Sequence, residues 1–349
     1  MRGIDLRVEA GRCVLVCGAS GCGKTTVTRL ANGLAPSFFP GTLEGRVLVD
    51  GRDVADLESW EVAACVGSVF QNPRTQFFNV DSTGEVAFSL ESMAWPEERI
   101  RERTHDTIRQ LGLEELADRS IFSLSGGEKQ RIAYASSWAP HPANLVLDEP
   151  TSNLDEAAIA ALRRYLLDAK AQGAAVLVAE HRLWWLADVA DEVVVMEEGR
   201  IARRFDGATF RALPSSEVRD LGLRVRALAD ERARERRAPG DAREPRAPLV
   251  RLRGVHASYG KREVLHGVDL DLREGEVAAL VGANGAGQVH PVPHHRGAHR
   301  ESAGTTTIDG EPAGPKQRLR ACSMVFQGRE LPAVRRQRAH RSELRADGR

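Results

Sequence analysis

The hydrophobic residues of this chain occur in short runs, separated by polar and glycine-rich segments. Four runs have the length and aliphatic content of buried strands: 14–16, 66–70, 145–147 and 176–179. Three further segments are expected to be helices: 26–32, 128–139 and 155–172. No run approaches the roughly 18–20 apolar residues that span a bilayer, and no signal peptide opens the chain.

A glycine-rich segment, 18–25, follows the first predicted strand and fits the phosphate-loop pattern G-x-x-x-x-G-K-[ST]. Glycines let backbone N–H groups turn toward phosphate oxygens, and the following helix adds the positive end of its dipole. Lys24 would reach the β- and γ-phosphates, and the Thr25 hydroxyl would lie on Mg²⁺. The residues expected to contact the nucleotide here are Gly18, Ala19, Ser20, Gly21, Cys22, Gly23, Lys24, Thr25 and Thr26.

Two more segments, LSGGEKQR at 124–131 and LVLDEP at 145–150, follow in that order. All three together resemble the ATP-binding cassette (ABC) ATPases. The resemblance implies an α/β P-loop fold with a parallel core sheet and a helical subdomain, inserted near residues 96–117. It also implies ATP and Mg²⁺ as cofactors, ATP hydrolysis, and a second cassette, because the LSGG segment of one domain closes over the ATP of another.

The same resemblance assigns roles to polar residues at the ends of the predicted strands. Asp148 would hold Mg²⁺ through water, and Glu149 would polarise the attacking water as general base. Gln71 would touch the metal and that water, and His181 would contact the γ-phosphate. The implied metal ligands are Thr25, Gln71 and Asp148, and the implied catalytic residues are Glu149, His181 and Gln71.

Residues of the LSGG segment and of the segment 152–155 would act across a dimer. The amides of Ser125, Gly126 and Gly127 would point at a γ-phosphate held by a different domain, which requires close backbone approach. The segment 152–155 resembles the loop that links the two sites of a dimer. Asp155 can equally be an ordinary N-cap of the helix that follows it, and both roles can hold.

The segments 69–78 and 85–91, with 181–183 and 195–201, resemble one branch of the superfamily, the energy-coupling factor transporter ATPases. This resemblance implies uptake of a vitamin or a transition-metal ion, at the cytoplasmic face of the cell membrane. The implied partners are a transmembrane coupling subunit, which residues 72–91 would face, and a substrate-binding membrane subunit. Phe77, Phe78 and Phe88 can alternatively be core aromatics.

Composition changes this picture little. The chain has 349 residues, 42% hydrophobic and 28% charged, which is long enough for two domains. A formal net charge of zero gives no support to nucleic-acid binding. The five cysteines lack the paired spacing of a metal site or a disulfide framework, and they fit a reducing compartment.

The chain contains a second, imperfect copy of its first part. The sequences at 3–6, 18–23, 49–51 and 69–71 recur at 267–270, 282–287, 308–310 and 325–327. The intervening stretch 224–248 is rich in Arg, Ala, Glu and Pro and reads as a linker. We therefore expect an ABC ATPase domain at 1–212, a linker at 213–249, and a truncated, degenerate second ABC ATPase domain at 250–349.

The second copy departs from the pattern where chemistry would need it. Gln288 and Val289 replace the lysine and threonine, and prolines at 291 and 293 prevent the helix that should follow. The pattern returns near Gly304 and is lost after Gln327, which is typical of reading-frame slips. The histidines at 290, 294, 295 and 299 give an alternative, a metal site, although no element would fix them.

The first copy lacks a counterpart of residues 252–260, which include Tyr259, the match to the residue that stacks on adenine in the family. We expect the first domain to lack its first strand and to bind ATP weakly by itself. Two functional alternatives stay open. One is a soluble ABC ATPase acting on ribosomes or DNA, and the other is a defective, frame-disrupted chain without activity.

Overall fold

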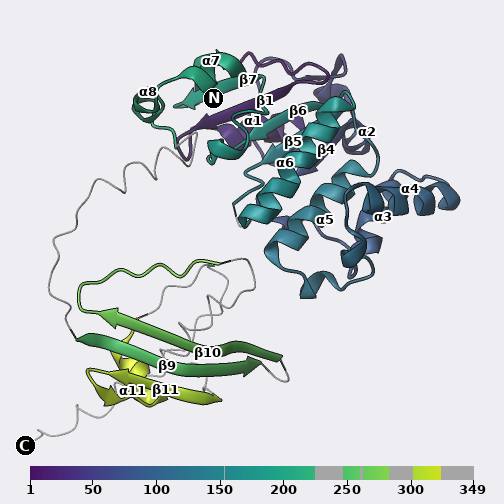
Figure 1. Ribbon diagram of the computed structural model, residues 1–349. Helices are drawn as coiled ribbons and strands as arrows, with labels where there is room; N and C mark the ends of the chain where they lie inside the picture. Colours follow the sequence, from purple (N-terminus) through teal and green to yellow (C-terminus); the bar gives the residue numbers. More distant parts are fainter. Residues whose placement is uncertain (153, 225–246, 260–261, 283–301, 324–349) are drawn as a thin grey trace, which may run out of the picture. The chain divides into compact units, whose positions relative to one another are not determined.

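The computed structural model describes residues 1–152, 154–224, 247–259, 262–282 and 302–323 (Figure 1). Contacts divide the chain into two compact units, Met1–Ala242 and Arg243–Arg349. The breaks in the second copy between 288 and 299, and its end after 327, lie outside the described residues.

A six-stranded sheet forms the centre of the first unit. Its order is β4 (Val66–Val69), β5 (Asn144–Asp148), β6 (Ala175–Ala179), β1 (Cys13–Gly18), β7 (Glu192–Glu197) and β8 (Arg200–Asp206). The first five strands are parallel, as predicted, so their carboxyl ends share one edge of the sheet. The sixth, β8, runs antiparallel to β7, because a tight turn through Glu198 and Gly199, both at positive φ, reverses the chain.

Both faces of this sheet are covered, because successive residues of β1 are buried on opposite faces. Val14 and Val16 belong to one buried cluster, together with Val27 of α1 (Lys24–Ala31) and Val62 of α2 (Ser59–Cys65). The alternate residues Cys13, Leu15 and Cys17 belong to the cluster on the other face, with α6 (Glu156–Ala171). A continuous apolar run is therefore what a central parallel strand needs.

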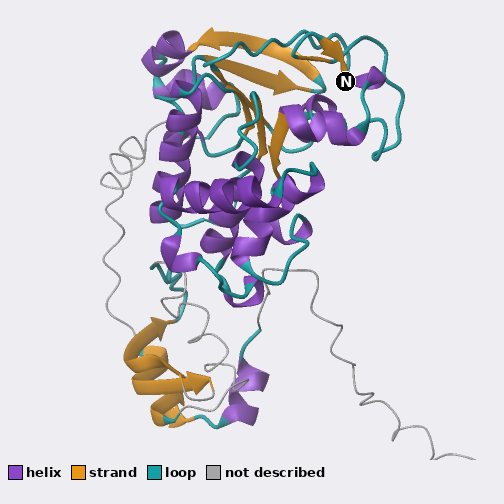
Figure 2. Ribbon diagram, turned by 90° about the vertical axis from the view of Figure 1, so that its right-hand side faces the viewer, coloured by secondary structure: helices purple, strands orange, loops and turns teal. Residues whose placement is uncertain are grey.

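A helical part lies at one end of the first unit, beside α6 (Figures 1 and 2). It contains α3 (Ser82–Ser92), α4 (Glu97–Gln110) and α5 (Gly126–Trp138), with short 3-10 turns at Glu114–Leu116 and Ile121–Ser123. The expected insert at 96–117 thus corresponds to α4 and the first turn, and the subdomain also takes in α3 and α5. The Tyr165 hydroxyl of α6 donates to Leu111 O at 2.7 Å and ties the two parts together.

Two short helices, α7 (Gly207–Ala212) and α8 (Ser215–Asp220), complete the first unit. Val218 and Leu223 are buried in the same cluster as α6, so packed structure continues past residue 212, where the linker was expected to begin. In the part of the chain that the structure describes, no helix is long and apolar enough to cross a bilayer.

The second unit contains an antiparallel sheet of four strands. Its order is β10 (Arg262–Arg273), β9 (Pro248–Tyr259), β11 (Ala303–Ile308) and β12 (Glu311–Pro312), and α11 (Pro315–Ala321) follows. Its small core is made by Val250, Leu252, Val255, Ala257 and Leu265. Residues 277–281, the counterpart of β1, are not in a strand, and Val277 is 97% exposed.

The repeated sequences therefore adopt different structures in the two units. Residues 267–270 lie in β10 and pair with β9, whereas their counterparts 3–6 are in no strand and pack loosely through Ile4 and Leu6. The nearby pair β2 (Leu48–Val49) and β3 (Arg52–Asp53) is only two residues long on each side. The remaining 3-10 turns are Val54–Asp56, Pro73–Thr75 and Leu183–Trp185.

We predict that Tyr165→Phe destabilises the first unit by about 1–3 kcal/mol, because the Leu111 carbonyl loses a buried donor. Urea unfolding followed by tryptophan fluorescence measures this, since all five tryptophans lie in the first unit. Ser92→Ala removes an exposed hydroxyl bonded within its own helix and is the control, with an expected change below about 0.5 kcal/mol. Equal stability of the two variants would contradict the prediction.

Candidate functional site

The phosphate loop begins where β1 ends. Gly18 has φ +140°, and a Cβ built there would lie 2.2 Å from the backbone oxygen of Met196. Only glycine fits such an approach, which explains the first glycine of the sequence pattern. The loop closes at Gly23, with φ 108°, and α1 starts at the next residue, Lys24.

Lys24 is buried, with 4% of its surface exposed. Its Nζ donates to Gly18 O at 3.1 Å and to Ala19 O at 3.0 Å, so the ammonium group is held against the loop itself. Phosphate oxygens are charged acceptors and form stronger hydrogen bonds than these carbonyls. The lysine is therefore placed to exchange the loop carbonyls for a nucleotide phosphate.

The side-chain oxygens of Thr25 and Asp148 lie side by side next to this loop. The Thr25 hydroxyl donates to Asp148 Oδ1 at 3.2 Å. Burial raises the pKa of Asp148, and the charge of Glu149 raises it further. Within the described residues no cluster of three acidic, histidine or cysteine side chains could hold a metal. Mg²⁺ commonly takes only one or two protein carboxylates plus substrate phosphates, so Thr25 and Asp148 fit a metal that arrives with the nucleotide.

Glu149 follows β5 and contacts side chains that follow two other parallel strands. Gln71 follows β4 and donates from Nε2 to Glu149 Oε2 at 2.8 Å. His181 follows β6, and its Nε2 lies 2.9 Å from Glu149 Oε1. Glu149 itself has a positive φ of 43°, which is uncommon for a non-glycine residue. The structure thus brings the three expected catalytic residues together, while their roles stay predictions.

Two buried residues that the sequence analysis missed hold His181 in place. The Glu180 carboxylate accepts from the backbone N–H of His181 at 2.7 Å and from that of Arg182 at 3.0 Å. Its other oxygen accepts from the Thr151 hydroxyl at 2.5 Å. Glu180 adjoins His181 in the sequence, which is a weak signal, but nothing in the sequence pairs it with Thr151.

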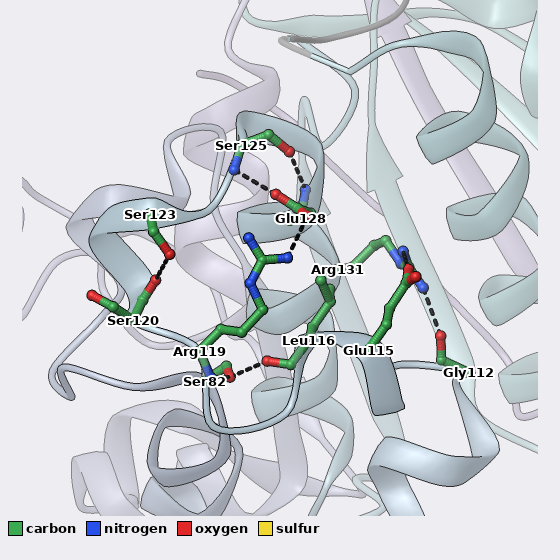
Figure 3. A network of polar contacts seen from close by, with 10 residues as sticks. All are labelled: Ser82, Gly112, Glu115, Leu116, Arg119, Ser120, Ser123, Ser125, Glu128 and Arg131. Atoms are coloured by element: carbon green, nitrogen blue, oxygen red, sulfur yellow. Dashed lines mark hydrogen bonds and ion pairs between the residues drawn. The ribbon is translucent and has the colours of Figure 1, made fainter. Parts of the chain in front are cut away.

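Ser125 forms the N-cap of α5 (Figure 3). Its backbone N–H donates to Glu128 Oε2 at 2.7 Å, and Glu128 N donates back to the Ser125 hydroxyl at 3.3 Å. Partial burial raises the pKa of Glu128, but the hydrogen bonds from Ser125 and the charge of Arg119 outweigh this and lower it. No hydrogen bond or ion pair among the described residues joins Ser125, Gly126 or Gly127 to the phosphate loop.

Asp155 is the N-cap of α6, and its Oδ1 accepts from Ala158 N at 2.9 Å. The capping alternative is therefore realised in the structure, and a role across a dimer stays a prediction. Ser152, in the same loop, donates to Gln71 O at 3.3 Å. Asn153 lies outside the described residues.

A cavity of about 310 Å³ in the first unit lies away from these groups. It is lined in part by Arg12 and Asp191, which precede β1 and β7, and is therefore at the amino ends of the strands. Asp191 already pairs with Lys170 at 2.6 Å. The phosphate loop lies at the opposite, carboxyl edge, so this cavity is not the nucleotide site.

Comparison with known proteins places this geometry in a family. The family model described as "ABC transporter" matches residues 1–152. A putative ABC transporter ATP-binding protein of Treponema denticola is 41% identical over 325 residues, covering 93% of this chain and 66% of that protein. Another from Streptomyces coelicolor is 34% identical over 383 residues, covering 94% of this chain and 67% of its own length.

Two solved structures resemble the chain as well. CbiO1 from Clostridium perfringens, part of the ABC transporter complex cbiONQ, is 27% identical with a TM-score of 0.55, covering 67% of this chain and 91% of that one. A dimeric bacterial ABC transporter cassette is 25% identical with a TM-score of 0.51, covering 58% and 88%. The chain belongs to the ABC transporter ATP-binding proteins, a family of ATPases that bind ATP with Mg²⁺.

We predict that Thr151→Val lowers ATP turnover roughly tenfold, because Glu180 loses its buried donor and His181 loses its fixed position. ATP affinity should stay within about twofold, since Thr151 does not line the phosphate loop. Thr151→Ser keeps a hydroxyl and should recover most of the turnover. Steady-state phosphate release and calorimetry measure the two quantities. A valine variant with full turnover would show that His181 needs no such support.

Proposed function

We propose that this chain is the ATP-hydrolysing subunit of an energy-coupling factor-type ABC importer for a vitamin or a transition-metal ion. It works at the cytoplasmic face of the membrane, with a transmembrane coupling subunit and a substrate-binding membrane subunit. The observation that carries the ATPase part is the contact of Gln71 and His181 with the two carboxylate oxygens of Glu149. The relation to a cbiONQ component supports the importer part.

The residues perform the reaction as follows. Lys24 would bind the β- and γ-phosphates, and Thr25 and Asp148 would hold Mg²⁺, whose charge would offset that of the phosphates when it is bound. Glu149 accepts the proton of the attacking water at a carboxylate oxygen. Gln71 and His181 hold the two oxygens of that carboxylate and so fix the direction from which the proton is taken. The released proton is then carried by Glu149 until product leaves.

Turnover is expected to depend on Glu149. Glu149→Gln should bind ATP normally and lose about 10²–10⁴-fold in hydrolysis rate, because the amide cannot accept a proton from water. Phosphate release measures the rate, and calorimetry measures binding. Lys24→Ala is the matched variant that should instead lose binding. Steady-state turnover in the glutamine variant equal to that of the parent would sink the assignment.

A second cassette is part of the proposal, because no hydrogen bond or ion pair among the described residues joins the phosphate loop of the first unit to its own Ser125–Gly127. Two first units that pair head to tail would place each LSGG segment over the other's nucleotide. Such an isologous pair closes by symmetry. A separate cassette could serve equally as the partner. The likeness to a dimeric ABC cassette supports pairing of this kind.

An exposed apolar patch on the helical part supports a protein partner. Phe78, Val80 and Phe122 are 74%, 68% and 80% exposed. Val80 O accepts from Ile121 N at 2.9 Å, so Val80 lies next to the segment that carries Phe122. Phe78 stacks on Phe88 at 4.8 Å, whereas Phe77 packs against the core. Contiguous exposed aromatic surface of this kind is typical of an interaction site.

The buried carboxylate of Glu85 fixes the backbone of this patch to α3. Its Oε2 accepts from the backbone N–H of Phe78 at 3.0 Å and from that of Asn79 at 2.8 Å. Burial raises the pKa of Glu85, and the two amides partly offset this. The backbone N–H of Phe70, the residue before Gln71, donates to Gln76 Oε1 at 3.3 Å. Displacement of the patch would therefore be transmitted toward Gln71.

Phe78→Ser combined with Phe122→Ser should abolish co-purification with the proposed transmembrane coupling subunit, because two apolar anchors are lost. ATP affinity should not change, since neither residue touches the phosphate loop. Trp60→Ser, which alters a residue 67% exposed on α2, is the control and should leave association intact. Co-purification that survives the double change would show that the partner binds another face.

A further inference from the structure

A cavity of about 190 Å³ lies beside the phosphate loop. One wall is made by residues 18–20 of the loop and another by Glu180 and His181. The third wall is unexpected from the family patterns, because it is made by Gly222, Leu223 and Arg224, the last described residues of the first unit. The end of this unit therefore reaches the place where nucleotide phosphates are expected.

The local sequence dictates this path. At the end of α8, Leu223 N donates to Val218 O at 3.2 Å and Gly222 N donates to Arg219 O at 2.8 Å. With Gly222 at φ +68°, these bonds form a Schellman motif, in which glycine supplies the left-handed residue. The apolar contact typical of the motif is present, because Val218 and Leu223 are buried in one cluster. The turn thus anchors Leu223 and delivers the next residue, Arg224, to the cavity wall.

Among the described residues that line this cavity, Arg224 is the one with a permanently charged cationic side chain. Glu180 is satisfied by Thr151 and two backbone amides, and His181 is directed at Glu149. Lys24 binds the carbonyls of Gly18 and Ala19, two residues of the cavity wall. Among the described residues no carboxylate lies within ion-pair distance of Arg224. A guanidinium in this position matches the oxygens of a terminal phosphate, which it can bind in a bidentate manner.

We propose that Arg224 binds the γ-phosphate of ATP held on Lys24, from the side of the phosphate loop on which His181 lies. The inference rests on the proposed ATPase function and adds a residue to it. Because ADP lacks the γ-phosphate, this contact is made with ATP and not with ADP.

The test uses the full chain carrying Glu149→Gln, so that ATP is bound without hydrolysis. Calorimetry with Mg²⁺ gives Kd for ATP and for ADP. Adding Arg224→Ala should weaken ATP binding by about tenfold or more, and change ADP binding by less than about twofold. Arg224→Lys should recover part of the ATP affinity. Arg219→Ala, at an exposed position of α8, which precedes Arg224, is the control and should change neither.

Each other outcome overturns the proposal. Equal weakening for ATP and ADP means that Arg224 supports the loop and does not contact the γ-phosphate. Unchanged ATP affinity means that Arg224 has no contact with nucleotide. Failure of the Glu149→Gln chain to bind ATP at all would overturn the proposed function itself. This outcome is distinct from failure of the Arg224 proposal, because it is seen in the chain in which Arg224 is unchanged. Retained ADP binding shows that the alanine variant is folded.

Discussion

The burial of β1 between β6 and β7 is the constraint on which the rest of this molecule depends. A strand with a hydrogen-bonded strand on each side and a buried apolar cluster on each face is held firmly, and its carboxyl end is therefore a fixed point. The phosphate loop starts from that point, with no space for a side chain at Gly18. Because β4, β5 and β6 are parallel to β1, Gln71, Glu149 and His181 emerge at the same edge. The shared direction of the strands therefore determines which residues come together at the site.

The sequence was informative where a requirement is local. Apolar runs predicted four of the five parallel strands but not β7, and the spacing of glycines predicted a loop that approaches an anion closely. The pairing of Thr151 with Glu180 was not predictable, because these residues come from two strand ends that only the sheet brings together. Phe77 and Phe78 show the same limit. They are adjacent and chemically identical, yet one packs on the core and the other is exposed, because Glu85 fixes the backbone between them.

The internal repeat shows that nearly the same short sequence adopts different structures when the neighbouring parts of the chain differ. Residues 267–270 form a strand beside β9, and the nearly identical residues 3–6 do not form one among the described residues. Similarly, the apolar run of β1 is buried, while its counterpart at 277–281 is exposed. Hydrophobic sequence alone does not make a strand here. A strand forms where hydrogen-bonding partners and a second apolar layer are supplied by other parts of the chain.

The positive φ of Glu149 has a cost that the fold must carry. A non-glycine residue in the left-handed region is destabilised by about 1–3 kcal/mol, and glycine or asparagine would relieve much of it. The chain is therefore less stable with the residue that can accept a proton than it would be with one that cannot. The bond from Glu149 N to Ala179 O at 2.8 Å helps to hold the strained peptide. Selection for thermal tolerance alone would push this position away from glutamate, and toward an inert protein.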